Sequence, residues 1–216
     1  VHKSKHIRQV WEDSRAAQEA DRMQCWVTGD GAPIARVHPN LKRVRGAQSS
    51  GATLVGFNAA AYESYNRSQG INAPVSEKAT IAYTTALNYL LSDANPNKKL
   101  FMGDATIIYW AESENRAYES AFAAFVDPAD LDDSSAKQTS RKKSEKDLKT
   151  VTEKVTRAKM LDLDALLADL KKENPQFYIL GLSPNAARVS VRFFITDPFH
   201  KIIDNIKAHY RDLAII

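Results

Sequence analysis

The spacing of apolar residues along the chain divides it into helical and extended segments. Helical spacing is strongest over residues 75–92, where the apolar positions fall on one face of the expected helix. Further helices are predicted over residues 6–23, 115–126, 161–172 and 198–216. The residues expected on the apolar face of the strongest helix are Ala79, Ala82, Tyr83, Ala86, Leu87, Leu90 and Leu91.

Extended segments are rich in β-branched and aromatic residues and are bounded by turn residues. The turn Gly29-Asp30-Gly31 lies between two short extended segments and predicts a hairpin, and residues 184–186 separate two longer ones. Because helices and strands are interspersed without regular βαβ spacing, we predict an α+β fold of mixed short strands and hairpins packed with amphipathic helices, forming a single region over residues 1–216. Strands are expected within residues 24–28, 33–39, 53–58, 100–110, 177–183 and 187–195. In the last of these strands, one side is expected to carry Val189, Val191 and Phe193 and the other side Arg188, Ser190 and Arg192. The apolar contacts expected for the last helix are Ile202, Ile203, Ile206 and Leu213.

One segment follows neither pattern. From about residue 134 to residue 146 the chain is rich in Ser and Lys and lacks large apolar residues. Such a segment buries too little apolar surface to offset the entropy of ordering it. We therefore expect a mobile surface loop there.

Composition adds little to this picture. The 216 residues are 44% hydrophobic and 26% charged, as in an ordinary globular protein. No apolar run approaches the roughly 20 residues that cross a bilayer and no signal-peptide pattern is present, so we expect a cytoplasmic protein without a membrane partner. The single cysteine, Cys25, excludes an internal disulfide and a multi-cysteine zinc site. No motif indicates a cofactor.

Charge distribution is more informative than the net charge of +4. Residues 31–62 contain no Asp or Glu but include four cations, and we call this stretch the basic window. Uncompensated cations are what a phosphate-facing surface requires, because each neutralised phosphate releases counterions. A solvated basic face without a nucleic-acid partner is the alternative. The cations are Arg36, Lys42, Arg43 and Arg45.

Within the basic window, the sequence GAQSSGAT over residues 46–53, here called the glycine loop, resembles a phosphate-binding P-loop. Gly46, Gly51 and Thr53 match that motif, but Ala52 replaces the lysine. A P-loop also follows a buried strand and opens a helix, whereas β-prone residues follow this loop. We interpret it as a small-residue loop that a nucleic-acid backbone can approach closely, or else as an ordinary turn.

Catalytic patterns are weak. Asp30 and Asp104 lie near turns, where Asp is favoured for local geometry, so a metal-dependent nuclease built on them is an alternative without specific support. Several aromatic residues could stack on unpaired bases, although such residues also fill cores. They are Trp26, Tyr62, Tyr65, Tyr83 and Trp110.

Two blocks of sequence point to a family. The stretch from APIARVHPNLKRVRGAQSSGATLVGFN through TIAYTTALNYLL closely resembles the large subunit of the type I-C CRISPR effector complex, the DNA-targeting Cascade assembly. The later stretch LGLSPNAARVSVRFF is similar to a second part of the same family. The resemblance covers about a third of the chain as distinct motifs, and it makes the chain an internal portion of that subunit.

The resemblance implies a non-enzymatic subunit that contacts the 5′ handle of the guide RNA and helps to recognise the motif adjacent to the target in double-stranded DNA. It also implies partners: the backbone and small subunits of the complex, and a separate helicase-nuclease that the complex recruits. In RNA-guided recognition, base pairing reads the target while protein reads the adjacent motif and the backbone.

Three hypotheses remain open: a nucleic-acid-binding subunit of a CRISPR complex, a metal-dependent nuclease, and a protein-docking scaffold without direct DNA contact. For the first hypothesis, lysine and arginine contact phosphate, while amides and hydroxyls contact phosphate or base edges. The candidate nucleic-acid-binding residues are Arg36, Lys42, Arg43, Arg45, Gln48, Ser49, Ser50, Asn58 and Asn72.

Overall fold

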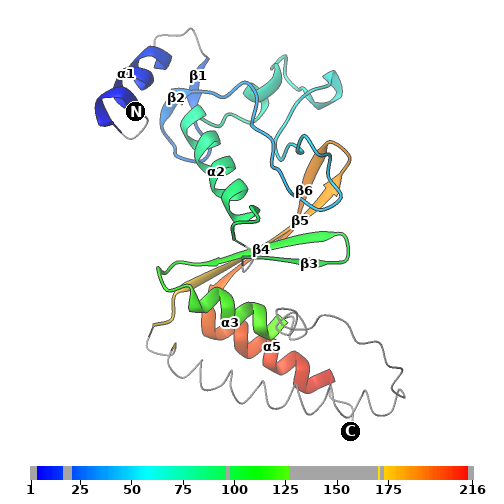
Figure 1. The fold of residues 1–216 in the computed structure, drawn as a ribbon. Helices are drawn as coiled ribbons and strands as arrows, with labels where there is room; N and C mark the ends of the chain where they lie inside the picture. The colour runs from blue at the N-terminus through cyan, green and yellow to red at the C-terminus, as the bar shows by residue number, and fades with distance from the viewer. Residues whose placement is uncertain (1–3, 17–20, 96–97, 127–169, 171–172, 214–216) are drawn as a thin grey trace. The chain divides into compact units, whose positions relative to one another are not determined.

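The computed structural model describes residues 4–16, 21–95, 98–126, 170 and 173–213 (Figure 1). Helices and antiparallel strands are interspersed along it, which confirms the α+β prediction. The chain divides into two compact units, unit 1 (Val1–Ser92 and Pro184–Ser190) and unit 2 (Asp93–Ser183 and Val191–Ile216). That residues 1–216 form a single region stays a prediction. The segment 134–146 and, except for Leu170, the helix expected over 161–172 lie outside the described residues.

Unit 1 opens with a helix and a short hairpin, both expected from the sequence, but Arg22 and Met23, which were predicted to be helical, lie in the first strand of the hairpin. The hairpin strands pair from Arg22↔Pro33 to Gln24↔Gly31, a few residues closer to the chain start than predicted. Cys25 is fully buried after the first strand, where its Sγ accepts a 3.2 Å hydrogen bond from the Ser76 amide. The elements of unit 1 are α1 (Lys5–Ala16), β1 (Arg22–Gln24), β2 (Gly31–Pro33), the 3₁₀ turns η1 (Ala60–Tyr62) and η2 (Gln69–Asn72), and α2 (Glu77–Leu90).

Helix α2 lies within the predicted range, but its buried face differs from the prediction. Ser76 caps its start by accepting a hydrogen bond from the Ala79 amide. Ala82 and Ala86 are exposed, whereas Thr80 and Thr84 are buried. The Thr84 hydroxyl donates to the Thr80 carbonyl, 2.7 Å away, so that it is not buried unpaired, whereas the Thr80 hydroxyl has no partner among the described residues. Ala79, Leu90 and Leu91 are buried as predicted, so apolar spacing alone located the buried face only in part.

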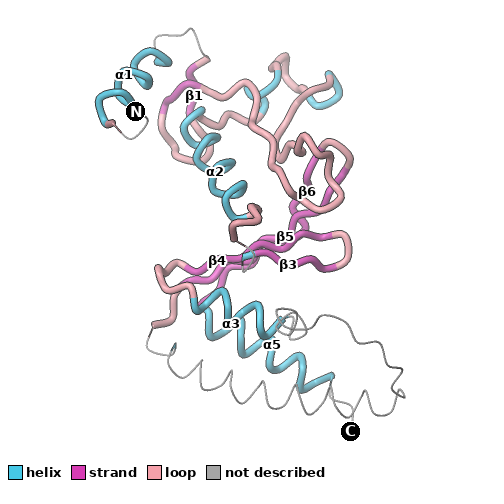
Figure 2. Tube along the Cα trace, in the orientation of Figure 1, coloured by secondary structure: helices cyan, strands magenta, loops and turns pink. Residues whose placement is uncertain are grey.

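The stretch between β2 and α2 is mostly loop (Figure 2). The strand expected over residues 53–58 is absent: this stretch makes only the isolated bridge Thr53↔Arg188, next to the bridge Leu41↔Ala52. Leu54, Val55 and Phe57 are β-prone, but β propensity depends on pairing with a second strand. Among the described residues, no strand pairs with residues 54–58. The prediction of a strand there was wrong.

Unit 2 is built on a four-stranded sheet with the order β3-β4-β5-β6. The β3–β4 hairpin turns at Gly103-Asp104, with Gly103 at φ +59°, and the β5–β6 hairpin turns where the sequence predicted. Residues 184–190 at the tip of the second hairpin belong to unit 1. The elements are β3 (Lys99–Met102), β4 (Ala105–Ala111), α3 (Ala117–Val126), β5 (Gln176–Asn185), β6 (Arg188–Pro198) and α5 (Phe199–Leu213).

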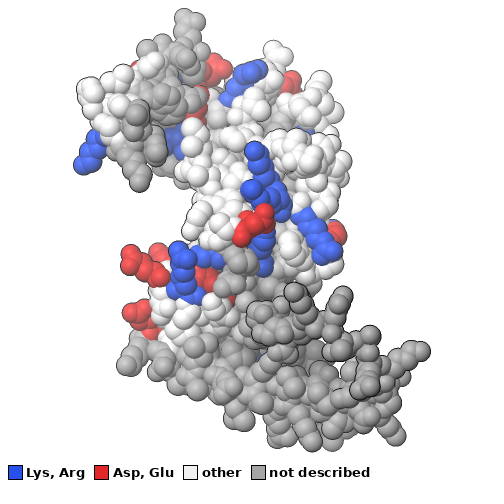
Figure 3. All heavy atoms as spheres, in the orientation of Figure 1, with Lys and Arg blue, Asp and Glu red and all other residues white. Residues whose placement is uncertain are grey.

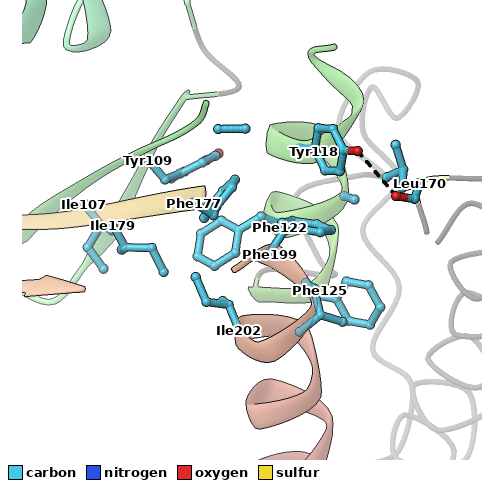
Figure 4. Close-up of a cluster of buried hydrophobic side chains, with 13 residues drawn as sticks. Ile107, Tyr109, Tyr118, Phe122, Phe125, Leu170, Phe177, Ile179, Phe199 and Ile202 are labelled. Atoms are coloured by element: carbon cyan, nitrogen blue, oxygen red, sulfur yellow. Dashed lines mark hydrogen bonds between the residues drawn. The ribbon is translucent and has the colours of Figure 1, made fainter. Parts of the chain in front are cut away.

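Alternate residues of β4 and β5 form an aromatic core with α3 and α5 (Figure 4). The Phe177 ring is fully buried and lies 5.1 Å from the Phe122 ring and 5.2 Å from the Phe199 ring, centroid to centroid. Tyr118 on α3 is buried as well, and its hydroxyl donates to the carbonyl of Leu170 at 3.3 Å. Burying such rings contributes most of the stabilisation a small sheet needs.

The strand β6 and helix α5 agree with the predicted pattern only in part. Val189, Ile202 and Ile203 are buried as expected. Val191 and Leu213, which were expected to make apolar contacts, are 50% and 59% exposed. A strand at the end of a sheet packs on fewer neighbours, so an alternating sequence there does not guarantee burial.

Candidate nucleic-acid interface

Over residues 41–45, exposed cations of the basic window alternate with buried apolar residues that hold the backbone in place. Leu41 is fully buried and Val44 is 4% exposed, whereas Lys42, Arg43 and Arg45 are exposed. Apolar side chains leave water while neighbouring charged side chains keep their hydration. The loop therefore presents three cations from a backbone that the core of unit 1 holds in place. Figure 3 shows that Lys and Arg side chains reach the surface on the face drawn.

Helix α2 supports this loop through one side chain. The Asn88 amide accepts a hydrogen bond from the Lys42 backbone N–H (2.8 Å) and donates one to the Asn40 carbonyl (3.1 Å). A side-chain amide can donate and accept at once, so a single residue satisfies two backbone groups of an otherwise irregular segment. The Asn40 side chain in turn accepts from the Thr53 hydroxyl at 2.9 Å.

The glycine loop is a tight turn that requires glycine at two points. Gly46 and Gly51 have φ of +78° and +96°, and a Cβ at Gly51 would lie 2.8 Å from the Leu41 carbonyl oxygen. Between them, Gln48, Ser49 and Ser50 are exposed. No α-helix begins at the end of the loop, because residues 54–59 are irregular, which agrees with our interpretation that it is not a P-loop.

The tip of the β5–β6 hairpin closes the other side of the glycine loop. The Thr53 amide donates to the Ala187 carbonyl and the Thr53 carbonyl accepts from the Val189 amide, both at 3.0 Å. Gly46 lies against Pro184 of the same tip, since a Cβ there would be 3.1 Å from the proline Cγ. Two segments distant in the sequence thus form one surface in unit 1.

Arg188 at this tip is a candidate that sequence reasoning missed. Its guanidinium lies 4.1 Å from the centre of the Tyr62 ring and donates to Asn58 Oδ1 at 2.7 Å. The alternation of β6 placed Arg188 on a polar face, but that pattern gives no indication of which partner it meets. Asn58 is thereby positioned by a residue from the far hairpin.

The remaining candidates have different environments. Arg36 is exposed and its Nη1 donates to Gln69 Oε1 at 3.1 Å. The Asn72 side chain accepts from the Ser64 amide and donates to the carbonyls of Arg67 and Gln69. Asn72 thus holds the backbone of its own loop together. The residues of positions 42–50 lie on one loop, while Arg36 and Asn58 line a separate pocket in the same unit.

The carboxylates considered for a nuclease lie in different units and in different surroundings. Asp30 is exposed in the β1–β2 turn. Asp104 accepts from the Ser183 hydroxyl (2.8 Å) and from Arg192 (3.2 Å), and these bonds, the Ser183 bond first, hold the pKa of its carboxyl below the usual range. Across the described residues, no three His, Cys, Asp or Glu side chains are grouped so that they could hold a metal ion.

Comparison with known proteins identifies the family. None of the helices among the described residues is long and apolar enough to span a membrane. A search of curated proteins gave no match. The family described as CRISPR-associated protein (Cas_Csd1) matches residues 1–216, the whole of the sequence. The chain therefore belongs to the Cas_Csd1 family of CRISPR-associated proteins.

Proposed function

We propose that this chain is a non-catalytic, nucleic-acid-binding part of the large subunit of a type I-C CRISPR surveillance complex. Its partners are the guide RNA, double-stranded target DNA, the backbone and small subunits, and a separate helicase-nuclease. The observation that carries the proposal is the exposed cationic loop of unit 1, anchored by Leu41 and Val44 and joined to the glycine loop. Because the chain belongs to a CRISPR-associated family, we expect the ligand of that loop to be a nucleic acid.

The geometry supports different roles for the cations of the loop and for Gln48. Lys42, Arg43 and Arg45 are suited to phosphate, which positions a duplex without reading its sequence. Gln48 at the exposed turn has an amide that can pair with a base edge. We therefore expect the cations to contribute affinity and Gln48 to contribute selectivity for the motif adjacent to the target.

Salt dependence tests the cationic part. Replacing Lys42, Arg43 and Arg45 singly with alanine should weaken binding of target DNA for every adjacent motif and flatten the slope of log K against log salt by about one unit per lost contact. Lys78→Ala is the matched control, because Lys78 is exposed in the same unit but lies outside the basic window. An unchanged slope in all three variants would favour the docking scaffold.

Motif discrimination tests Gln48. Gln48→Ala should reduce the preference for the correct adjacent motif by about 1 to 3 kcal/mol while leaving non-specific affinity nearly unchanged. Thr85→Ala, at an exposed position of helix α2 outside the basic window, is the control and should leave the discrimination unchanged. Equal discrimination by wild type and Gln48→Ala would assign base reading to another part of the subunit.

Two further measurements address the whole proposal. The protein should co-purify with a guide RNA when it is expressed with the other subunits of the complex. The purified chain should leave DNA uncut in Mg²⁺. Cleavage that disappears in Asp30→Asn or Asp104→Asn would establish the nuclease alternative instead.

A further inference from the structure

A loop of unit 1 over residues 63–68, here called the tyrosine loop, holds a bulky residue in an unfavourable conformation. The Arg67 amide donates to the Ser64 carbonyl at 3.0 Å and closes a turn. Both residues between them have positive φ, +53° at Tyr65 and +58° at Asn66. Asparagine adopts this conformation readily, whereas a bulky residue does so only under strain. Such strain persists where the surrounding structure imposes it, and it is concentrated at ligand sites.

Hydrogen bonds from outside the turn impose this conformation. The Asn72 side chain accepts from the Ser64 amide at 2.9 Å and donates to the Arg67 carbonyl at 2.8 Å. The Glu63 carboxylate accepts from the Gln69 amide at 2.8 Å. The backbone of the tyrosine loop is therefore fixed both before and after Tyr65.

The side chains of the turn, in contrast, are not used to hold the loop. Tyr65 is 95% exposed, the largest exposed fraction among the large hydrophobic residues that the structure describes. The side chains that make no hydrogen bond or ion pair with any other described residue are those of Tyr65, Asn66, Arg67 and Ser68. A ring, an amide, a guanidinium and a hydroxyl are thus open to a ligand on a backbone that is already ordered, so that binding orders little further chain.

These side chains surround a hollow of about 290 Å³, whose described lining is residues 63–68. The lining is polar apart from the Tyr65 ring. An apolar side chain of a protein partner would require apolar neighbours, which this lining does not offer. A free phosphate would use Arg67 and leave the ring exposed.

A nucleobase matches every group of this lining. It offers a flat face to the ring, hydrogen-bonding atoms at its edge to the amide and hydroxyl, and a phosphate next to it to the guanidinium. The base must be unpaired, because within a duplex the neighbouring bases cover both of its faces.

Two further cations flank the tyrosine loop. Immediately after it, Arg36 Nη1 donates to Gln69 Oε1 at 3.1 Å. Immediately before it, the Arg188 guanidinium lies 4.1 Å from the centre of the Tyr62 ring. Positive charge on both sides of an exposed ring suits a strand whose phosphates continue beyond the stacked base.

We propose that Tyr65 stacks on one unpaired base of a nucleic-acid strand. Asn66 and Ser68 contact the edge of that base, and Arg67 contacts the adjoining phosphate. The inference rests on the proposed nucleic-acid binding and adds an unpaired strand to its ligands.

A comparison of two strands with equal charge tests the stacking. The full chain is titrated with a short single-stranded oligothymidylate and with an abasic strand of the same length. Wild type should bind the thymidylate about tenfold more tightly, because a base gains stacking on Tyr65. Tyr65→Asn should lose this preference and should bind the abasic strand as wild type does. Asparagine adopts positive φ, so this variant removes the ring and keeps the turn.

Two variants control for indirect effects. Tyr65→Phe keeps a ring and should retain most of the preference. Tyr89→Asn, at a tyrosine of helix α2 that is 52% exposed, should retain all of it. Should Tyr65→Asn fail to fold, Tyr65→Gly replaces it, because glycine adopts a φ of +53° without strain.

An oligouridylate of the same length distinguishes the two sources of an unpaired strand. Tighter binding of the uridylate than of the thymidylate assigns the site to guide RNA, and the reverse order assigns it to a DNA strand. Either result supports the stacking if Tyr65→Asn weakens binding of the preferred strand.

The outcomes separate the two proposals. Equal affinity of wild type for the thymidylate and the abasic strand overturns the stacking and leaves the proposed function standing. A preference that persists in Tyr65→Asn also overturns it, because the base is then recognised elsewhere. Equal weakening of both strands in Tyr65→Asn overturns it too, since the ring then acts on the fold rather than on a base. If neither strand binds and target duplex does not bind either, the proposed function fails together with the stacking.

Discussion

Units 1 and 2 of the chain hold their backbones in different ways. Unit 2 uses a sheet whose alternate residues pack with two helices around Phe177 and its aromatic neighbours. Unit 1 uses a two-stranded hairpin, isolated bridges, and side chains such as Asn88 and Asn72 that bond the backbone directly. Loops secured in this way keep exposed polar groups at fixed positions, and binding residues are often found on such loops. The candidate interface accordingly lies in the unit with less regular structure.

The largest effect should come from removing the centre of the aromatic core in unit 2. Phe177→Ala should lower the free energy of unfolding of that unit by about 3 to 5 kcal/mol, because it leaves a cavity among packed rings. Hydrogen exchange of the β4 and β5 amides measures the loss of stability in unit 2. Phe101→Ala, at a position that is 48% exposed, should cost far less. Similar losses for the two variants would contradict the core as described.

The next effect tests backbone geometry in unit 1. Gly51→Ala should cost about 2 to 3 kcal/mol, since it combines a positive φ with a Cβ that meets the Leu41 carbonyl. Gly29→Ala is the matched control, because Gly29 has φ +79° but open space around it, and should cost about 1 kcal/mol. Thermal or urea unfolding of both variants gives the difference. Equal losses would mean that the close approach to Leu41 is not a constraint.

A smaller effect should follow from loss of the Asn88 side chain. Asn88→Ala removes both bonds to the loop at residues 40–42 and should speed amide exchange at Lys42 by an amount that corresponds to about 1 kcal/mol. Thr85→Ala, at an exposed position of the same helix, should leave that exchange unchanged. If Lys42 exchanges equally slowly in Asn88→Ala, the loop is held by other contacts.

The smallest effect concerns pH. Burial lowers the pKa of His38 in the folded chain, while an unfolded histidine titrates near 6.5. Below about pH 6.5 the unfolded chain therefore binds a proton that the folded chain does not, and stability should fall until the pH passes the folded pKa. His38→Gln should remove this contribution to the pH dependence of urea unfolding. His209→Gln, at an exposed site, should leave this contribution in place. An identical pH profile for His38→Gln and wild type would contradict the prediction.

Local signals explain which parts of the fold could be predicted. Helix α2 and the β5–β6 hairpin follow from spacing and turn residues within a short stretch, and the exposed cations follow from an acid-free window. The pairing of Thr53 with the hairpin tip does not follow, nor does the bond from Arg188 to Asn58, 130 positions away. His38 meets Tyr83 across 45 positions for the same reason. Such contacts depend on tertiary packing, which apolar spacing does not encode.

The bridge from Thr53 to the β5–β6 tip has a consequence for how the protein is made. Unit 1 is discontinuous: its residues 184–190 reach the ribosome exit only after residues 93–183 have been synthesised. Until then the Thr53 amide and carbonyl lack the partners they have in the finished chain. During synthesis, unit 1 therefore lacks the two hydrogen bonds of Thr53 until the hairpin tip has emerged. A fragment that ends at Ser92 would lack them permanently.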